Sequence, residues 1–343
     1  MAEPRDPIAD LKRIAFLLEV MQEPGFRVRA FRSAASALAE LSPEVIAARA
    51  ATGTLRQLTG IGEVTERTIL ESLRGEEPVY LRRLEATEGT PQAEGAAELR
   101  AALRGDLHSH TEASDGHFSI AEMAEAAIEL GHEYLVITDH SPRLTIANGL
   151  STERLMKQLD DIARLNAELA PFRLLTGIEV DINEDGSLDQ SDEVLSRLDV
   201  VVGSSHSALR MPSAPMTRRM VTALANPHLD VLGHCTGRMR RKRRNRPEST
   251  FDAEIVFAAA ARFDKAIEIN CLPDRLDPPK RLLRLAIESG CRVSIDSDAH
   301  YIGQLAWVRV GCERAHLCGV TPEMIVNAMP VDELLAWTAA HEN

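Results

Sequence analysis

The sequence predicts an α/β protein in which seven parallel strands close into a barrel, preceded by a small all-α domain. Two observations carry this prediction. From residue 105 onward, short apolar runs alternate with segments of helical periodicity, as expected for parallel strands joined by crossover helices. Before residue 87 the apolar spacing is helical. We therefore expect a helical domain over residues 1–86, a linker over 87–104 whose Ala/Leu/Arg stretch could form a short helix at its end, and the barrel over 105–343.

The composition is that of an ordinary globular protein, with 44% hydrophobic and 27% charged residues over 343 positions. A net charge of -13 argues against binding of nucleic acid over the whole surface but leaves room for a local basic patch. No apolar run approaches the length of a membrane span, and the first residues do not resemble a signal peptide. The five cysteines form no CxxC pair, which disfavours a zinc ribbon or a disulfide framework. A cytoplasmic location is expected.

The N-terminal stretch predicts short helices. Ile8–Met21 has apolar residues at helical spacing. An Ala-rich helix follows the segment Phe26–Arg32 and runs to Leu41, and a further helix lies between Pro43 and Gly53.

A Gly-Ile-Gly turn lies between two of the expected helices, at residues 60–62. The backbone N–H groups of such a turn can approach a phosphate closely, with a helix N-terminus behind them. The alternative is a plain turn between two helices. The preceding segment, residues 26–32, interleaves aromatic residues with arginines. The candidate DNA-binding residues are Arg27, Arg29, Arg32, Gly60, Ile61 and Gly62.

Residues 14–85, with the motifs at 24–31, 58–62 and 69–75, resemble the N-terminal DNA-end-binding domain of family X DNA polymerases. The resemblance implies a helix-hairpin-helix that holds the DNA backbone. In that family a lysine after the hairpin forms a Schiff base for lyase chemistry. Here Thr68 occupies the matching position beside Arg67, and neither side chain supplies that amine. We expect a DNA-binding domain without lyase activity, followed by a linker too short to hold a polymerase palm.

Seven apolar runs after the linker are the expected strands: Gly105–His108, Tyr134–Thr138, Arg173–Val180, Leu198–Gly203, Leu229–Gly233, Ala266–Ile269 and Arg292–Ile295. The expected helices between them are Ile120–Leu130, Thr152–Ala170, Ser191–Arg197, Met216–Ala225, Phe251–Arg262 and Pro279–Ser289. Barrels of this kind place their chemistry at the carboxyl ends of the strands.

Two His-containing pairs lie at the carboxyl ends of the first and the last expected strands. His108 and His110 are two residues apart, so in an extended chain their imidazoles face the same side. Asp298 and His300 repeat this arrangement. Two converging side chains make half of a metal site.

Other strand ends carry further candidate ligands, each of which could alone be a core histidine or a rim charge. Because Asp139 and His140 are adjacent, only one is expected to face inward, and the other to orient a ligand. Mixed imidazole and carboxylate ligands suit manganese, zinc or iron, and metals sharing a carboxylate can activate water for attack on a phosphate. The further candidates are His140, Glu179, His206 and His234.

Residues 106–116, 137–140, 177–181, 203–206, 233–234 and 298–300 together resemble the polymerase-and-histidinol-phosphatase (PHP) domain, from Gly105 to about Val310. The resemblance implies a distorted (β/α)7 barrel with three divalent metal ions. Residues 237–238 and 268–277 most resemble the form of the domain that is fused to bacterial family X polymerases.

Carried over by position, the resemblance implies three ligand sets. One metal would be held by His108, His110, Glu179 and Asp298. A second, sharing Glu179, would be held by His206 and His234. The third would be held by Asp115, His140 and His300, with His117 as an alternative to Asp115. The expected catalytic residues are His108, His110, Glu179, His206 and Asp298.

Arginines near these ligands could hold phosphates, namely Arg238 and Arg275. The basic run at residues 240–246 is either a DNA contact or a solvated loop. The function expected is a metal-dependent phosphoesterase that processes DNA at 3′ ends. One alternative is a small-molecule phosphatase of the histidinol-phosphate type. Another is a non-enzymatic DNA-end adaptor, against which the nine filled ligand positions argue.

Overall fold

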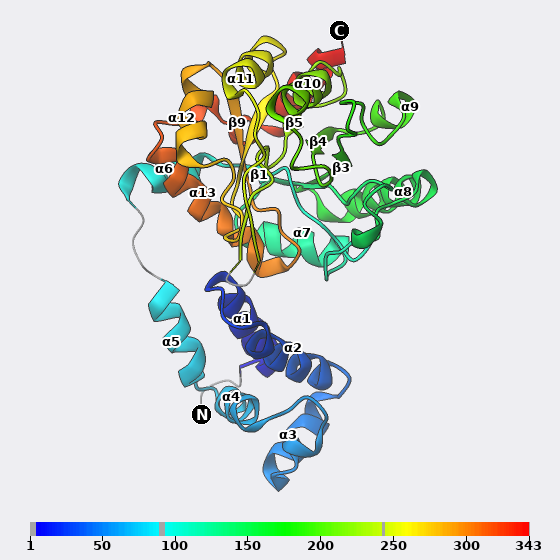
Figure 1. Ribbon diagram of the computed structural model, residues 1–343. Helices are drawn as coiled ribbons and strands as arrows, with labels where there is room; N and C mark the ends of the chain where they lie inside the picture. The colour runs from blue at the N-terminus through cyan, green and yellow to red at the C-terminus, as the bar shows by residue number, and fades with distance from the viewer. Residues whose placement is uncertain (1–4, 89–92, 242–243, 343) are drawn as a thin grey trace. The chain divides into compact units, whose positions relative to one another are not determined.

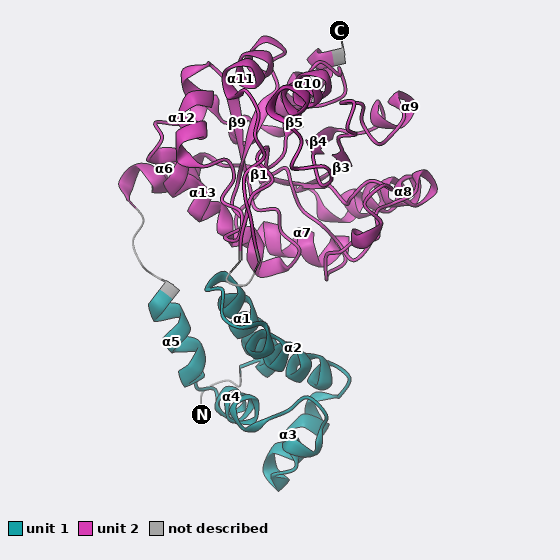
Figure 2. Ribbon diagram, in the orientation of Figure 1, with its two compact units in different colours: residues 1–91 teal, residues 92–343 magenta. Residues whose placement is uncertain are grey.

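The computed structural model describes residues 5–88, 93–241 and 244–342. It divides into two compact units, residues 1–91 and 92–343 (Figures 1 and 2). In the described residues, no helix is both long and apolar enough to cross a membrane.

The first unit is helical, as predicted. Its apolar core includes Leu11, Ile14, Phe31 and Leu38, all 3% exposed or less. The Phe26–Arg32 segment lies inside the second helix and does not precede it, because Pro24 ends the preceding turn and the chain is helical from the next residue. The helices are α1 (Pro7–Val20), α2 (Gly25–Ala39), α3 (Pro43–Thr52), η1 (Leu55–Gln57), α4 (Glu63–Leu73) and α5 (Val79–Glu88).

The Gly-Ile-Gly turn joins η1 to α4. Gly60 has a φ of +93°, and a Cβ added there would lie 3.1 Å from the backbone oxygen of Ser33 on α2. Ile61 is 7% exposed. The turn is therefore packed against α2, in a conformation that favours glycine.

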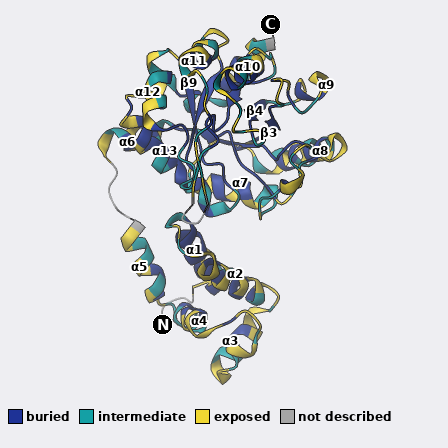
Figure 3. Cartoon of the chain, viewed as in Figure 1, coloured by how far each residue is buried: buried dark blue, intermediate teal, exposed yellow. Residues whose placement is uncertain are grey.

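The second unit contains all seven predicted strands, each pairing in parallel with the next in the order β1-β2-β3-β4-β5-β8-β9. Figure 3 shows these strands buried, with helices around them that expose their outer faces. The strands are β1 (Gly105–Asp106), β2 (Tyr134–Ile137), β3 (Arg173–Asp181), β4 (Val200–Ser204), β5 (Val231–Leu232), β8 (Ala266–Asn270) and β9 (Arg292–Asp296). The six predicted helices are α7 (Ile120–Glu129), α8 (Thr152–Leu169), α9 (Asp192–Leu195), α10 (Ser213–Leu224), α11 (Ala253–Arg262) and α12 (Lys280–Glu288).

The seam between β1 and β9 is nearly closed. Ser109 and Ala299 form an isolated parallel bridge, and Ala299 O accepts a hydrogen bond from His110 N at 2.8 Å. Before this bridge, within the strands themselves, Asn327 Nδ2 donates to Gly105 O of β1 at 3.0 Å and to Ile295 O of β9 at 2.8 Å. One amide therefore joins the two strands where their backbones do not pair.

Helix α6 (Glu94–Ala102) forms at the end of the linker, where a short helix was expected, and its Leu99 packs in the core with Val308 and Cys312 of α13 (Val308–His316). Two features were not predicted. In the basic run, β6 (Met239–Arg241) pairs antiparallel with β7 (Arg244–Arg246). After α13, 3₁₀ helices (including η5, Val326–Ala328) lead to a last α-helix, α14 (Val331–Ala339).

Candidate metal centre

The nine predicted metal ligands lie at or just beyond the carboxyl ends of the strands, and the structure brings them into one cluster. Glu179 is at its centre and is 1% exposed. It comes from β3, at the position paired with Val202 of β4. Two residues earlier, a Cβ on Gly177 would lie 2.8 Å from Val200 O, so the strand can lie this close to its neighbour only with glycine there.

Both oxygens of Glu179 face imidazoles. Oε2 lies 2.8 Å from His140 Nδ1 and 3.4 Å from His108 Nε2. Oε1 lies 2.8 Å from His234 Nε2 and 3.2 Å from His206 Nε2. A single carboxylate thus connects side chains that follow β1, β2, β4 and β5, the arrangement required of a bridging ligand.

Asp298 provides a second buried carboxylate, 1% exposed. Its Oδ1 lies 3.3 Å from His110 Nε2 and 3.8 Å from His108 Nε2. His300 Nδ1 lies 3.7 Å from the same oxygen. Asp298 has a φ of +55°, a left-handed conformation that is costly for most residues other than glycine and less so for Asp and Asn.

Of the two alternatives for the outer ligand, the structure brings Asp115 to the cluster. Its Oδ1 lies 3.5 Å from both His140 Nε2 and His300 Nε2, and 3.9 Å from His110 Nδ1. His117 instead has its Nε2 2.7 Å from Tyr301 Oη, and the two rings stack with centroids 4.0 Å apart.

Electrostatics keep the carboxylates of the cluster ionised. Burial opposes ionisation of Glu179, but the nearby imidazoles of His140 and His206 hold its pKa well below the usual value. Burial likewise opposes ionisation of Asp298, but His108 and His110 keep its pKa well below the ordinary range. The centre therefore presents fixed negative charge to a cation.

The pKa values of the imidazoles are shifted in opposite directions at different positions of the cluster. Burial, together with the charges of His300 and His140, lowers the pKa of His110 to about 4. For His140, burial opposes protonation, yet Glu179 and Asp115 raise the pKa to about 10. Without a metal ion, protons thus offset the carboxylate charge, and metal binding would displace them because only the neutral imidazole is a ligand.

The buried ring nitrogens fit a metal site. Among the described residues, His108 Nε2 and both ring nitrogens of His110 make no hydrogen bond of acceptable geometry. The carboxylate oxygens of Glu179 and Asp298 lie 3.3–3.8 Å from the Nε2 atoms, too far for good hydrogen bonds. Buried polar groups without partners are costly, and divalent cations between these atoms would satisfy them.

Glu268 of β8 was not predicted as a site residue. Its Oε1 lies 2.5 Å from His108 Nδ1, and its Oε2 accepts from His234 N at 2.5 Å. Asn270 Nδ2 donates to both Glu268 and Asp298, at 3.2 and 3.0 Å. A charged residue in a buried strand was the available signal, because such a charge needs a partner.

Asp139 faces away from the cluster, and His140 faces into it. Asp139 accepts hydrogen bonds from Thr111 N at 2.8 Å and Gln158 Nε2 at 2.6 Å. Ser114 Oγ also donates to it. Its role is thus to hold the loop that carries Asp115. A separate carboxylate, that of Asp181, accepts from His206 N at 3.1 Å.

The two arginines expected to hold phosphate are placed differently. Arg275 Nε lies 3.2 Å from Asp298 Oδ2. Within the described residues, its Nε and Nη1 are buried without a hydrogen-bond partner. Arg238 instead donates from Nε to Arg275 O at 2.9 Å and also contacts Leu276 O and Glu248. Arg275 therefore reaches Asp298, a predicted metal ligand, whereas the Arg238 guanidinium is bound to the neighbouring loop.

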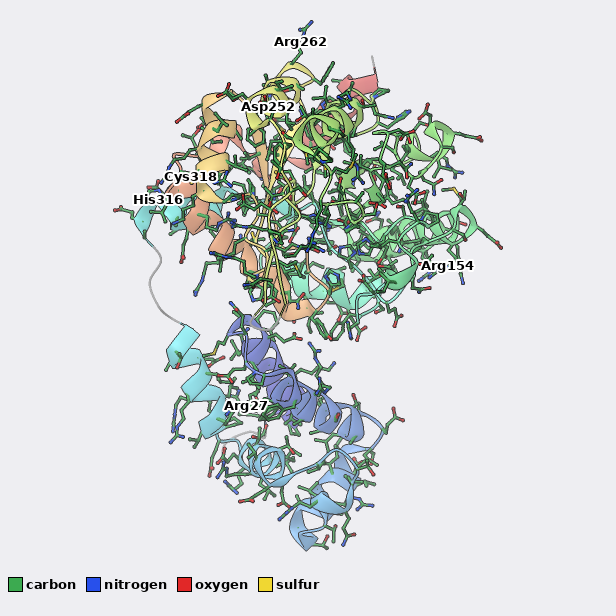
Figure 4. All side chains as sticks on the ribbon, viewed as in Figure 1. Arg27, Arg154, Asp252, Arg262, His316 and Cys318 are labelled. Carbon is green, nitrogen blue, oxygen red and sulfur yellow. The ribbon has the colours of Figure 1, made fainter. Side chains whose placement is uncertain are left out.

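Several candidate DNA contacts in the first unit also have partners. Arg32 pairs with the buried carboxylate of Glu19, and Arg27 Nη1 lies 2.8 Å from Glu23 Oε2 (Figure 4 labels Arg27). Arg29 is exposed. Gly62 N donates to Thr65 Oγ1 at 2.9 Å.

Thr68, at the position of the lyase lysine, is 1% exposed. Its hydroxyl donates to Val64 O at 3.1 Å. The side chain is therefore buried and engaged by the backbone of its own helix.

Comparisons with known proteins agree with both resemblances. Residues 106–271 match the model of the PHP domain, and residues 4–77 match that of a helix-hairpin-helix domain. The DNA polymerase/3′-5′ exonuclease PolX of Bacillus subtilis (strain 168) is 40% identical over 235 residues, which is 68% of this chain but 41% of that protein. The chain thus spans less than half the length of that relative.

Other relatives are covered over most of their length. A protein of Caldanaerobacter subterraneus subsp. tengcongensis named "Probable phosphatase TTE1963" is 31% identical over 217 residues, which is 60% of this chain and 79% of that protein. A crystal structure of histidinol phosphate phosphatase from Lactococcus lactis, with zinc, L-histidinol and phosphate, has a TM-score of 0.45 and 16% identity, over 64% of this chain and 94% of that chain. The chain belongs to the PHP-domain family and carries a helix-hairpin-helix domain ahead of its barrel.

Proposed function

We propose that this chain is a metal-dependent phosphoesterase that hydrolyses phosphate esters at DNA 3′ ends. The observation that carries the proposal is Glu179, whose two oxygens face imidazoles from four different strand ends. The relatives support hydrolysis of phosphate esters, since they are named as an exonuclease and as phosphatases.

The cluster would hold three divalent ions, of manganese, zinc or iron. Possible groups of donor atoms are His110 with Asp115, His140 and His300; His108 with His110 and Glu179; and His140 with Glu179 and His206. Two further predicted ligands border these groups. His234 Nε2 lies 2.8 Å from Glu179 Oε1, and Asp298 Oδ1 lies 3.3 Å from His110 Nε2. When bound, the ions would supply activated water and neutralise charge on the phosphate.

The chain's own residues hold the substrate. Arg275 lies beside Asp298, with Nε 3.2 Å from its Oδ2, and its buried Nη1 makes no hydrogen bond within the described residues, so it can donate to a phosphate oxygen. Burial raises the pKa of the Cys235 and Cys271 thiols well above the usual value, so these thiols stay protonated and unreactive. The proposed hydrolysis therefore uses water and no covalent intermediate with these cysteines.

The helical unit supports DNA as the substrate. Its turn holds Gly60 in a left-handed conformation at the start of α4, and its residues match the helix-hairpin-helix model. Such a unit would raise the local concentration of a DNA end near a metal centre that accepts many phosphate esters.

A second candidate is a phosphatase acting on small phosphate esters, of the histidinol-phosphate type. It is favoured by the relatives named as probable phosphatases, 79–91% of whose length is covered by this chain. Their similarity extends over 60–66% of this chain.

The test is to measure hydrolysis of 3′-recessed DNA, 3′-phosphate DNA and histidinol phosphate side by side, with manganese or zinc supplied. We expect the DNA substrates to be turned over with the higher kcat/KM. Deleting residues 1–95 should reduce activity on DNA far more than activity on an aryl phosphate. Turnover of histidinol phosphate alone, or equal DNA activity in both forms, would replace the proposal with the second candidate.

A further inference from the structure

A cavity of about 720 Å³ lies between the β6–β7 hairpin and the start of α12. Among its lining residues are four arginines and one acidic residue, Glu248. We call it the arginine cavity; its arginines are Arg238, Arg240, Arg246 and Arg281.

The concentration of positive charge is unusual for this protein. The chain carries a net charge of -13. A second cavity, of about 530 Å³ beside α8, is lined by three basic residues and two acidic ones, so its charges nearly cancel. The arginine cavity is therefore the better anion site of the two.

The single acidic residue contacts two of the four arginines, and the cavity keeps an excess of positive charge. Glu248 Oε1 lies 3.5 Å from Arg238 Nη1, and its Oε2 pairs with Arg281. One carboxylate is thus shared between two guanidinium groups. Arg240 is an exposed side chain, while its backbone N donates to Asp274 O at 2.6 Å and fixes the hairpin to the loop after β8.

That same loop forms part of the metal centre. Arg275 points from the loop toward Asp298, and its backbone oxygen accepts from Arg238 of the cavity. The hairpin itself begins five residues after His234, another of the proposed ligands. The metal centre and the arginine cavity are therefore joined by one short segment, residues 271–278.

We propose that the arginine cavity binds backbone phosphates of a DNA strand whose end lies in the metal centre. This inference rests on the proposed function and adds a substrate subsite to it. A small monoester has one phosphate, which the metal centre takes, so a second cationic site contributes only when the substrate is a polyanion. Arginine donates two parallel hydrogen bonds to a phosphate, and such contacts position a strand without reading its sequence.

The test compares Arg240→Ala and Arg281→Ala with wild type in the full-length, metal-loaded protein. The substrates are an aryl phosphate and a series of oligothymidylates from the dinucleotide upward. In wild type, KM should fall as phosphates are added. Each variant should raise KM for the longer oligothymidylates by about tenfold and weaken its salt dependence, since one charge-assisted contact is lost. Kinetics on the aryl phosphate should not change.

Arg262→Ala is the matched control, because Arg262 is an exposed arginine at the end of α11, where it points away from the barrel (Figure 4). It should behave as wild type on every substrate. If wild type shortens oligothymidylates and the two cavity variants do so with unchanged KM, the cavity assignment is wrong while the proposed function stands. An equal loss on the aryl phosphate and on DNA would also overturn it.

A different result separates the two proposals. If wild type hydrolyses only small esters, the proposed function fails. Fluorescence anisotropy of a labelled oligothymidylate, measured in chelator, then tests whether the arginine cavity binds DNA. Binding by Arg240→Ala that is about tenfold weaker than that of wild type supports the cavity assignment, and equal affinity overturns it.

Discussion

Glu268 Oε1 lies 2.5 Å from His108 Nδ1, on the side of the imidazole opposite to the proposed metal site. The contact directs Nε2 toward Glu179, whose Oε2 is 3.4 Å away. Carboxylates in this position fix the ring and the tautomer of a metal-binding histidine.

We therefore expect Glu268→Gln to weaken metal binding by about 10- to 100-fold, with a smaller effect on folding. Metal titration of the apoprotein with a competing chelator measures this, and thermal unfolding of the apoprotein provides the stability comparison. Glu288→Gln, at the exposed end of α12, is the control and should leave affinity unchanged. If the Glu268→Gln variant bound metal with wild-type affinity, the contact between Glu268 and His108 would have no role in metal binding.

Asp298→Asn should lower both the metal content and the activity. The metal content of wild-type protein purified without chelator should approach about three ions per chain, from the nine ligand positions. Asn tolerates the left-handed φ of +55° at this position, so the change removes mainly the charge. We expect activity to fall by more than about 100-fold, since losing an outer partner alone costs about 10- to 100-fold. Elemental analysis and phosphate release measure the two effects; a chelator-resistant wild-type activity would contradict both.

The strands and the clustering of the candidate ligands could be predicted because their signals are local. A strand is a short apolar run, and a ligand such as His108 or Asp298 follows it within a few residues. The contacts that complete the site are not local. Asn327 joins the seam to Gly105 across 222 positions, and Glu268 reaches His108 across 160, so neither pairing leaves a trace in the nearby sequence.

Helix α6 shows a case in which the local signal gave the helix but not its packing. The Ala/Leu/Arg stretch indicated a short helix at the end of the linker, and the structure packs its Leu99, together with Leu103, in the core with α13. Tertiary burial of a few apolar residues stabilises a short helix that its own sequence would support weakly. The β6–β7 hairpin was missed because its residues are mostly basic, so the sequence lacks the alternation of apolar and polar residues by which a strand is recognised.

The helical unit should bind DNA through phosphates without cleaving abasic ends. Affinity of the full-length protein for a gapped duplex should fall linearly with salt on logarithmic axes, as counterions are released. Arg29→Ala should reduce that slope by about one, because Arg29 is an exposed cation on α2, the helix whose Ser33 lies against Gly60. Arg82→Ala, an exposed arginine on α5, is the control. Borohydride should trap no covalent adduct with an abasic site, since Thr68 supplies no amine. A trapped adduct would show that the prediction of no abasic-end cleavage is wrong.

Acid sensitivity of the barrel should depend on His132. This side chain is 5% exposed, and among the described residues neither ring nitrogen has a hydrogen-bond partner. Burial, with a smaller contribution from the charge of Arg100, lowers its pKa from 6.5 to about 3. The folded state therefore holds the neutral ring, while the unfolded chain takes up a proton below pH 6.5. Its stabilising contribution is complete above that pH and is lost as the pH falls toward about 3.

The unfolding free energy of wild type should accordingly fall more steeply below pH 6.5 than that of His132→Leu, by up to about 1.4 kcal/mol per pH unit. Urea unfolding followed by tryptophan fluorescence measures the barrel alone, because both tryptophans, Trp307 and Trp337, lie in it. Both proteins are compared in chelator, so that loss of metal contributes equally. His316→Leu is the control, since that histidine is exposed on α13. Parallel pH profiles for wild type and His132→Leu would show that the buried imidazole becomes protonated without unfolding the barrel.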